Sequence, residues 1–209
     1  MPIISNINSI IFDLGGVIIN LSPGKTYQAF SEISGLPITE VEEMARSKQE
    51  FSLYETGHLS DEDFRSFLRI SLAINVTDNI LDQAWNAMLL DIPPQRLQTL
   101  LRLKTNYKTF LLSNTNAIHL KAFNKILREV SGSENFEQYF EKDYYSHEMG
   151  LRKPDPTIFE YVVREQRLNP AETIFLDDSS INLTGAAQAG LHIHHVTNAD
   201  ELFKELDKY

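Results

Sequence analysis

The 209-residue chain contains no cysteine, which excludes disulfides, thiolate metal sites and cysteine nucleophiles. It also lacks any apolar run long enough to cross a membrane. Basic residues are few: 19 Lys and Arg stand against 29 Asp and Glu, for a net charge of −10. Such a surface repels a nucleic-acid duplex, and no local basic cluster interrupts it. We therefore expect neither a nucleic-acid nor a membrane partner.

The beginning of the chain has neither the basic segment nor the long apolar stretch of a signal peptide, so we expect a cytoplasmic protein. The length and a hydrophobic content of 42% are ordinary for one sizeable domain, or for a core domain with a small insertion. No feature of the sequence indicates the oligomeric state.

Short apolar runs typical of buried strands recur along the chain, and helical patterns lie between the later ones. Strands are predicted at Ile10–Asp13, Thr109–Ser113, Tyr144–Ser146, Thr173–Asp177 and Leu191–Val196. Helices are predicted at Asn116–Glu129, Thr157–Gln166 and Ile181–Ala189. Alternation of this kind predicts an α/β fold with a doubly wound parallel sheet, a Rossmann-like core.

The stretch from residue 20 to 91 has a different character, because it contains helical patterns and no convincing strand. The expected helices are Thr26–Ile33, Thr39–Ser47, Asp61–Ser71 and Asn79–Leu90. The chain restarts at Pro93-Pro94 before a helical pattern at Gln95–Lys104. We expect a core of residues 1–19 and 92–209, with 20–91 as a small all-helical cap inserted after the first strand. An extended helical layer within one domain also fits this pattern.

The first strand run ends at an aspartate. Apolar residues Ile10 to Phe12 precede Asp13, and Gly15 and Gly16 follow it. Glycines let the backbone turn sharply and approach a ligand closely. In open parallel sheets, ligands bind at the carboxyl ends of the strands. Asp13 therefore stands where a binding site is expected, although an aspartate there also fits an ordinary turn.

Three further polar motifs stand at or just beyond predicted strand ends. Ser113 and Asn114 end the second strand, Lys153 lies in the loop after the third, and Asp177 and Asp178 end the fourth. Each taken singly has an ordinary structural interpretation, as a helix cap or a solvated loop. Because parallel strands gather their carboxyl ends at one edge of a sheet, the four motifs together predict a shared cleft.

These groups suit phosphoryl transfer through a covalent intermediate. The carboxylate of Asp13 can attack phosphorus and form an aspartyl phosphate. Lys153, the Ser113 hydroxyl and the Asn114 backbone amide can stabilise the charge on the phosphoryl oxygens. Two adjacent carboxylates suit a hard cation such as Mg²⁺. The sequence therefore predicts a magnesium-dependent site for a small phosphorylated substrate.

The motifs closely resemble the four motifs of the haloacid dehalogenase superfamily. They are Phe12-Asp13-Leu14-Gly15-Gly16-Val17, Ser113-Asn114, Lys153-Pro154 and Asp177-Asp178. Three longer stretches resemble its bacterial sugar-phosphatase branch, which includes α-glucose-1-phosphate phosphatases: Leu112–Asn116, Gly150–Pro154 and the cap segment Tyr54–Ser60. The resemblance covers nearly the whole chain. It implies a magnesium-dependent phosphatase that hydrolyses a small phosphorylated metabolite, such as a sugar phosphate, through an aspartyl-phosphate intermediate.

The resemblance also implies a role for each motif residue. Asp13 would be the nucleophile and would bind Mg²⁺ together with Asp178 and the backbone carbonyl of Gly15. Asp177 would lie behind the metal ligands or reach the metal through water, and Asn182 would support the metal loop. The phosphoryl group would be held by Ser113, Asn114 and Lys153. The cap would close over the substrate as a lid.

The sequence departs from this resemblance at one position. Most phosphatases of the superfamily carry a second aspartate, a general acid and base, where this chain has Gly15. A metal-independent dehalogenase also lacks that aspartate, but it has no need for the pair Asp177-Asp178. A catalytically silent phosphosugar-binding or regulatory protein is a second alternative, supported by Gly15 alone. Contacts to the leaving group are expected from the cap, with Tyr27, Glu55, His58 and Arg65 as candidates; Glu55 and His58 are also candidate proton donors.

Overall fold

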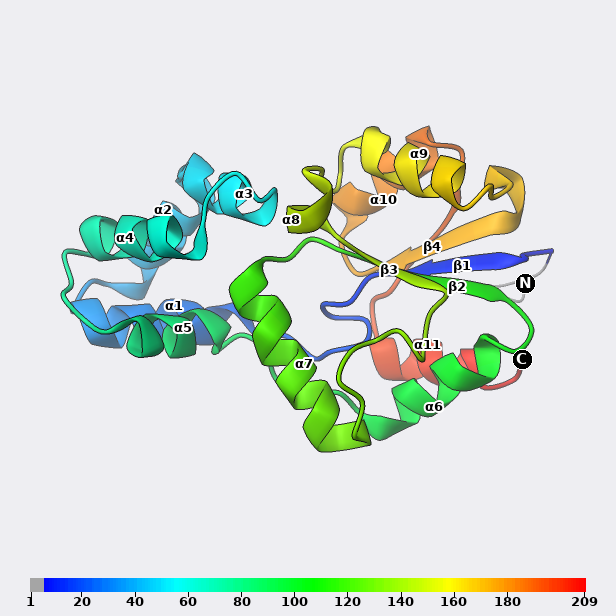
Figure 1. Ribbon diagram of the computed structural model, residues 1–209, viewed down its shortest axis with the longest axis horizontal. Coiled ribbons are helices and arrows are strands. Elements are labelled where there is room, and N and C mark those ends of the chain that lie inside the picture. Colours follow the sequence, from blue (N-terminus) through cyan, green and yellow to red (C-terminus); the bar gives the residue numbers. More distant parts are fainter. Residues whose placement is uncertain (1–5) are drawn as a thin grey trace.

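A five-stranded parallel sheet forms the centre of the computed structural model, which describes residues 6–209 (Figure 1). Its strands are β1 (Ser9–Phe12), β2 (Lys108–Ser113), β3 (Lys142–Tyr145), β4 (Thr173–Asp177) and β5 (His192–His195). Their order is β3-β2-β1-β4-β5, so the chain changes winding direction beside β1. This confirms the predicted doubly wound sheet and places a topological switch point, where such folds bind ligands, at the end of β1.

Helices cover both faces of the sheet and form the insertion. The insertion contains α1 (Pro23–Ser34), α2 (Ile38–Ser47), α3 (Gln49–Glu55), α4 (Asp61–Leu72) and α5 (Asp78–Asn86). The remaining helices are α6 (Pro94–Leu103), α7 (Ala117–Ser131), α8 (Ser146–Met149), α9 (Pro156–Glu165), the 3₁₀ helix η1 (Pro170–Glu172), α10 (Ser180–Gln188) and α11 (Ala199–Leu206). The helical insertion after β1 is thus confirmed. Within residues 6–209, no helix is long and apolar enough to cross a membrane.

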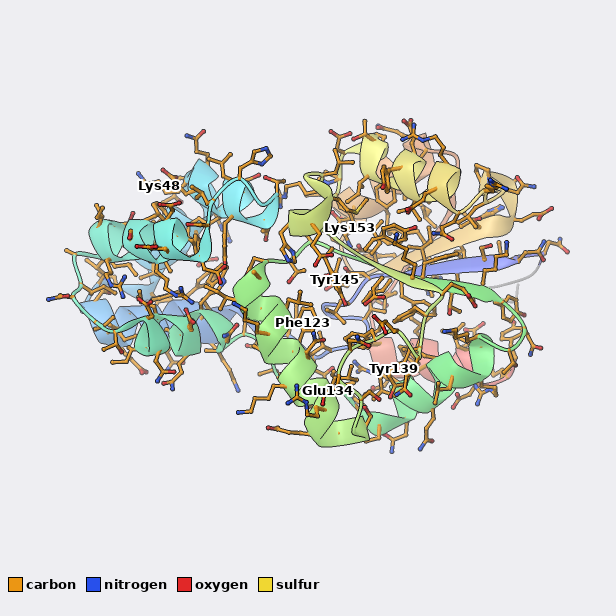
Figure 2. All side chains as sticks on the ribbon, in the orientation of Figure 1. Lys48, Phe123, Glu134, Tyr139, Tyr145 and Lys153 are labelled. Atoms are coloured by element: carbon orange, nitrogen blue, oxygen red, sulfur yellow. The ribbon has the colours of Figure 1, made fainter. Side chains whose placement is uncertain are left out.

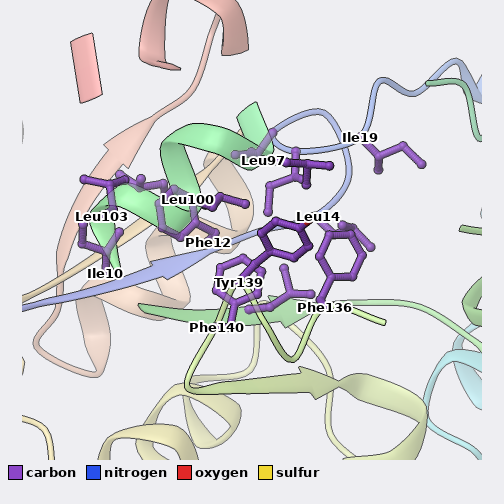
Figure 3. Close-up of a cluster of buried hydrophobic side chains, with 14 of the residues drawn as sticks. Ile10, Phe12, Leu14, Ile19, Leu97, Leu100, Leu103, Phe136, Tyr139 and Phe140 are labelled. Carbon is purple, nitrogen blue, oxygen red and sulfur yellow. The ribbon is translucent and has the colours of Figure 1, made fainter. Parts of the chain in front are cut away.

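Packing on both faces fixes the strand that carries Asp13. Ile10 and Phe12 pack into a cluster with α6, α7 and α11 (Figure 3). Ile11 belongs to the opposite cluster, with α9 and α10. All three side chains are fully buried. Burial of each contributes about 1.5–3 kcal/mol. The end of β1 is therefore a rigid support for the residue that follows it.

The cap has a separate hydrophobic core. Phe64, Leu68 and Trp85 belong to it, and Ile118 from α7 completes it on the side of the sheet domain. The ring of Tyr54 stacks on Phe64 at 4.0 Å between centroids. Helix α6 packs with the sheet instead. These separate clusters support our proposal that residues 20–91 form the cap. The proposed core and the segment searched for a signal peptide both include residues 1–5, which lie outside the described residues.

Two paired segments connect the cap to the sheet domain. Asn20 donates its backbone N–H to Asp91 at 2.9 Å and accepts from Leu90 at 3.0 Å. Ser22 donates to Met88 at 2.9 Å, and an antiparallel bridge joins the two residues in between, Leu21 and Leu89. The chain thus leaves and re-enters the core through a short two-stranded ribbon, which we call the stem.

Several predicted elements were wrong in part. The helix predicted to run to Leu90 ends at Asn86, because the following residues pair with the outgoing chain in the stem. Ser146 was predicted to end a strand but begins α8. Helices α3 and α11 were not predicted. The first is seven residues long and lies one residue beyond α2, so its pattern merges with its neighbour.

Candidate active site

The predicted motifs meet at the carboxyl edge of the sheet, beneath the cap. A cavity of about 230 Å³ lies there. All the predicted site residues but one line it: Asp13, Gly15, Ser113, Asn114, Lys153, Asp178 and Asn182. The exception is Asp177, which is fully buried directly behind the cavity wall. The structure therefore brings together what the sequence placed in four separate segments.

Lys153 is the centre of this arrangement, and Figure 2 shows it near α8, between the sheet and the cap. Its side chain is 1% exposed. The ammonium nitrogen lies 2.5 Å from Asp13 Oδ1 and 2.9 Å from Asp177 Oδ2, and it donates to the Leu112 carbonyl at 2.9 Å. Burial lowers the pKa of Lys153, but the two carboxylates outweigh this and hold its pKa above the usual value. The lysine is thus a fixed positive charge.

The side chain of Asn114 holds the backbone of this lysine. Asn114 Nδ2 donates to the Lys153 carbonyl at 2.8 Å, and Asn114 Oδ1 accepts from the Lys153 N–H at 2.8 Å. The pair of bonds locks the loop after β3 to the end of β2. The amide side chain is therefore engaged in positioning, and a phosphate contact from Asn114 remains a prediction for its backbone N–H.

The two adjacent aspartates have different environments. Asp177 Oδ1 accepts from the Ser179 N–H at 2.7 Å, and Asn182 Nδ2 lies 3.2 and 3.0 Å from the two Asp177 oxygens. Together with Lys153, these donors occupy the buried carboxylate. Asp178 is instead exposed toward the cavity. Asn182 therefore donates to Asp177, and its support of a metal loop stays a prediction.

Three carboxylates form a cluster suited to a cation. One oxygen from each of Asp13, Asp177 and Asp178 lies within 4.8 Å of the others. Burial, together with the charges of Asp177 and Asp178, raises the pKa of Asp13 to about 7, against the opposing effect of Lys153. Burial and the charge of Asp177 likewise raise the pKa of Asp178. One lysine does not balance three carboxylates, and hard oxygen donors in excess negative charge fit Mg²⁺.

At Gly15 and Gly16, neighbouring side chains come so close to the backbone that a Cβ atom would collide with them. Gly16 has φ +72°, and a Cβ atom there would collide with the Asp178 carboxylate. A Cβ atom on Gly15 would meet the side chain of Leu21. Where the resemblance leads one to expect a second aspartate, the space is therefore taken by a leucine from the stem.

Of the four cap residues considered from the sequence, Glu55 alone lines the cavity. Arg65 is bound instead to Asp82 through two bonds of 2.8 Å. His58 is exposed, and its Nδ1 lies 2.9 Å from a neighbouring threonine hydroxyl. Tyr27 packs against the hydrophobic core of the cap. Burial raises the pKa of Glu55, while the nearby Arg152 opposes that rise.

Sequence reasoning missed much of the cavity wall on the cap side. The stem and the helices α5 and α7 contribute Leu21, Trp85, Met88, Leu89 and His119. His119 stacks on Trp85 with 4.7 Å between ring centroids, and its Nδ1 lies 2.7 Å from Asn86 Oδ1. Burial lowers the pKa of His119 to about 3, so the ring is neutral. His119 lies in the first turn of the helix that follows Ser113-Asn114, and this position could have indicated from the sequence that it lines the cavity.

The comparisons with known proteins agree with this geometry. A family model of haloacid dehalogenase-like hydrolases matches residues 7–190. The chain belongs to this family. Among curated proteins, D-ribitol-5-phosphate phosphatase from Bacteroides thetaiotaomicron is 28% identical over 200 residues, which cover 96% of this chain and 97% of that protein. The haloacid dehalogenase-like hydrolase described here is therefore similar along nearly its whole length to a phosphatase.

Solved structures give the same result. A haloacid dehalogenase family enzyme from Bacteroides thetaiotaomicron, in complex with magnesium and inorganic phosphate, superimposes with a TM-score of 0.83 at 37% identity, covering 90% of this chain and 93% of that one. An L-2-haloacid dehalogenase from Xanthobacter autotrophicus has a TM-score of 0.59 at 19% identity, covering 97% and 83%, and shares the fold. The superfamily resemblance is confirmed. The narrower likeness to α-glucose-1-phosphate phosphatases is not specifically supported, since the curated relative is named for a sugar-alcohol phosphate.

Proposed function

We propose that this hydrolase is a magnesium-dependent phosphomonoesterase for a small sugar phosphate or sugar-alcohol phosphate. The observation that carries the proposal is the buried Lys153 ammonium between Asp13 and Asp177, with the exposed carboxylate of Asp178 beside them. A metal-independent dehalogenase needs no such excess of carboxylates. The similarity to a phosphatase and to a magnesium and phosphate complex supports the same function.

In the proposed reaction, a carboxylate oxygen of Asp13 attacks phosphorus and the bond to the leaving-group oxygen breaks. The leaving group takes up a proton and departs as an alcohol. Water then hydrolyses the aspartyl phosphate, which restores the Asp13 carboxylate and releases inorganic phosphate. Asp13 is positioned for this by its backbone N–H, which donates to Leu176 at 2.9 Å, and by the buried strand before it.

The remaining motif residues hold the phosphoryl group. The fixed charge of Lys153, the Ser113 hydroxyl and the Asn114 backbone amide stabilise the charge that develops on its oxygens. We assign the metal ligands as Asp13, Asp178 and the Gly15 carbonyl, with Asp177 behind them. Mg²⁺ bound there would reduce the repulsion between the anionic substrate and the nucleophile.

The activity is tested directly by phosphate release. We expect the purified protein to hydrolyse sugar phosphates, sugar-alcohol phosphates and an aryl phosphate with Mg²⁺, to lose this activity in EDTA, and to regain it when Mg²⁺ is restored. No release from any ester of the panel at several pH values would refute the proposal. Halide release from haloacids without Mg²⁺ would favour a dehalogenase, and tight phosphosugar binding without turnover would favour a binding protein.

The two adjacent aspartates should differ when each is replaced. Asp178→Ala should abolish activity together with the response to Mg²⁺. Asp177→Ala should weaken the apparent Mg²⁺ affinity by about 10- to 100-fold, the usual cost of losing a residue behind a metal ligand. It should also lower the thermal unfolding temperature, because Lys153 and Asn182 lose a buried partner. Mg²⁺ titrations of activity, paired with thermal denaturation, distinguish the variants; a more severe kinetic defect in Asp177→Ala would reverse our ligand assignment.

A further inference from the structure

A buried arginine outside the four motifs contacts the turn that follows Asp13. Arg96 lies in the first turn of α6, and its side chain is 4% exposed. Its Nη1 donates to the backbone carbonyls of Val17 and Ile18, at 3.1 Å each. Its Nη2 donates to Asp200 Oδ1 at 2.8 Å. One guanidinium group therefore joins α6 and α11 to the segment that carries the nucleophile.

The turn after the nucleophile closes on itself through backbone hydrogen bonds. The Leu14 carbonyl accepts from two N–H groups of the turn at 2.9 Å, and Gly16 donates to the Ile19 carbonyl at 2.8 Å. In the described part of the chain, no backbone N–H bonds the carbonyls of Val17 and Ile18, and both residues are fully buried. Buried carbonyl groups are normally hydrogen-bonded. The arginine therefore supplies the two bonds that the turn itself does not make.

Arg96 also lies where the stem enters the sheet domain. It lines one cavity together with Asn20 and Asp91, which pair with each other in the stem. Its guanidinium carbon lies 5.9 Å from the centroid of the Phe203 ring, which belongs to the hydrophobic core on this face of the sheet. The turn is thus anchored to the sheet domain between the nucleophile and the cap.

Stability alone does not explain why a charge is buried here. The Nε atom of Arg96 is buried with no hydrogen-bond partner among the described residues, and the side chain of its carboxylate partner Asp200 is 69% exposed. Well-packed apolar side chains often stabilise a protein as much as a buried ion pair does. An apolar side chain cannot bond two carbonyls, however. The role of Arg96 therefore lies in the turn that it holds.

That turn carries a group that we assign to the metal site. A β-bridge joins Gly15 to Ile19, the residue after the two carbonyls that Arg96 bonds. The planar guanidinium presents its donors in a fixed geometry, so its two bonds restrain the orientation of those peptide groups. Because the turn is short and closed, restraint at this end also limits movement of the Gly15 carbonyl.

We propose that Arg96 is a positioning residue for phosphoryl transfer. By holding the turn after Asp13, it keeps the Gly15 carbonyl and the Asp13 carboxylate in the relative positions that a shared Mg²⁺ ion requires. It acts through the backbone and contacts neither the substrate nor the metal. This inference rests on the proposed phosphomonoesterase function and its metal site.

Arg96→Met tests the proposal, because it keeps an unbranched side chain and removes all the hydrogen bonds. We expect the Kd for Mg²⁺, measured by isothermal titration calorimetry without substrate, to rise by about 10-fold or more. With an aryl phosphate, kcat should fall by about 100-fold, the usual effect of a small misplacement of reacting groups. At saturating Mg²⁺, KM should stay near the wild-type value, because the residues assigned to the phosphoryl group, such as Lys153, lie outside this turn.

Arg102→Met is the matched control. Arg102 also extends from α6 to the region of α11, where its Nη2 lies 2.6 Å from Asp207 Oδ1, but it makes no contact with the turn after Asp13. Its loss should leave the Kd for Mg²⁺ and kcat at their wild-type values. Thermal denaturation of both variants shows which of them are folded at the assay temperature.

The outcomes separate this inference from the proposed function. Wild-type values of Kd and kcat in folded Arg96→Met overturn the positioning role and leave the function standing. Equal losses in Arg102→Met overturn it as well, since they show a general effect of loosening the two helices. No phosphate release from the wild type contradicts the proposed function, and Mg²⁺ binding then decides the positioning role by itself. A wild type that binds no Mg²⁺ overturns the metal site and the positioning role together.

A second variant applies if Arg96→Met does not fold. Arg96→Lys keeps the positive charge and the alkyl chain, but one ammonium group does not reproduce the planar fork of donors. We expect its Kd for Mg²⁺ to rise and its kcat to fall, each by less than in the methionine variant. Wild-type values of both in Arg96→Lys would overturn the proposal.

Discussion

Replacing Asp13 with Asn is expected to abolish phosphate release while the protein remains folded. The amide keeps the size of the carboxylate and removes the nucleophilic charge. Loss of the covalent nucleophile lowers kcat by about 10⁶-fold in a well-studied hydrolase, and we expect a loss of that order. Steady-state phosphate release with the best substrate measures it, and beryllium fluoride should form an acyl-phosphate mimic on Asp13 of the wild type. Wild-type turnover in Asp13→Asn would refute the covalent mechanism.

The same substitution should change how stability depends on pH. Burial raises the pKa of Asp13 to about 7 in the folded protein, well above that of a free aspartate, so the folded state holds this proton more tightly. The folded wild type should therefore lose free energy of unfolding, relative to Asp13→Asn, as the pH rises from about 4 to about 7. Urea denaturation in magnesium-free buffer measures the difference. A difference that stays constant across this range would show that the site does not penalise the Asp13 charge.

Replacing Lys153 with Ala should be the most damaging single change for stability. It leaves the carboxylates of Asp13 and Asp177 buried without their shared cation. Breaking a buried pair in this way costs about 3–5 kcal/mol, and activity should be lost because the phosphoryl charge has no fixed partner. Lys121→Ala is the matched control: its 3.1 Å pair with Asp61 is exposed, and such pairs contribute about 0–1 kcal/mol.

Urea denaturation of Lys153→Ala and Lys121→Ala, with phosphate release measured on the same samples, tests this expectation. If both variants unfold at the same urea concentration as the wild type, Lys153 does not stabilise the carboxylate cluster. If Lys153→Ala keeps its activity, the lysine does not hold the phosphoryl group. Either result would require a different centre for the site.

The core of the site was predictable because each of its residues stands at the end of an apolar strand run. Asp13, Ser113 and Asp177 follow short buried strands, and a parallel sheet brings such ends to one edge regardless of the distance between them in the sequence. Lys153 was predicted from its place in the loop after the third strand. Its complete burial was not, because that depends on how β1, β2 and β4 lie around it.

The cap side of the site could not be predicted in the same way. Helical periodicity identifies the apolar face of a helix, but it does not show whether Trp85 on that face lies against the cap core, the cavity or both. The role of the Asn114 side chain depends on a contact with the loop 39 residues away. The end of α5 at Asn86 reflects a similar limit, since pairing of the next residues in the stem overrides a continuing helical pattern.

The stem both connects the cap to the sheet domain and forms part of the cavity wall. Leu21, Met88 and Leu89 belong to the two paired segments and also line the cavity. Any movement of the cap that bends the stem therefore changes the shape of the cavity wall. Because the two segments are hydrogen-bonded to each other, they bend as a unit. Substitutions at these three positions can therefore change the shape of the cavity without changing the residues at the ends of the strands.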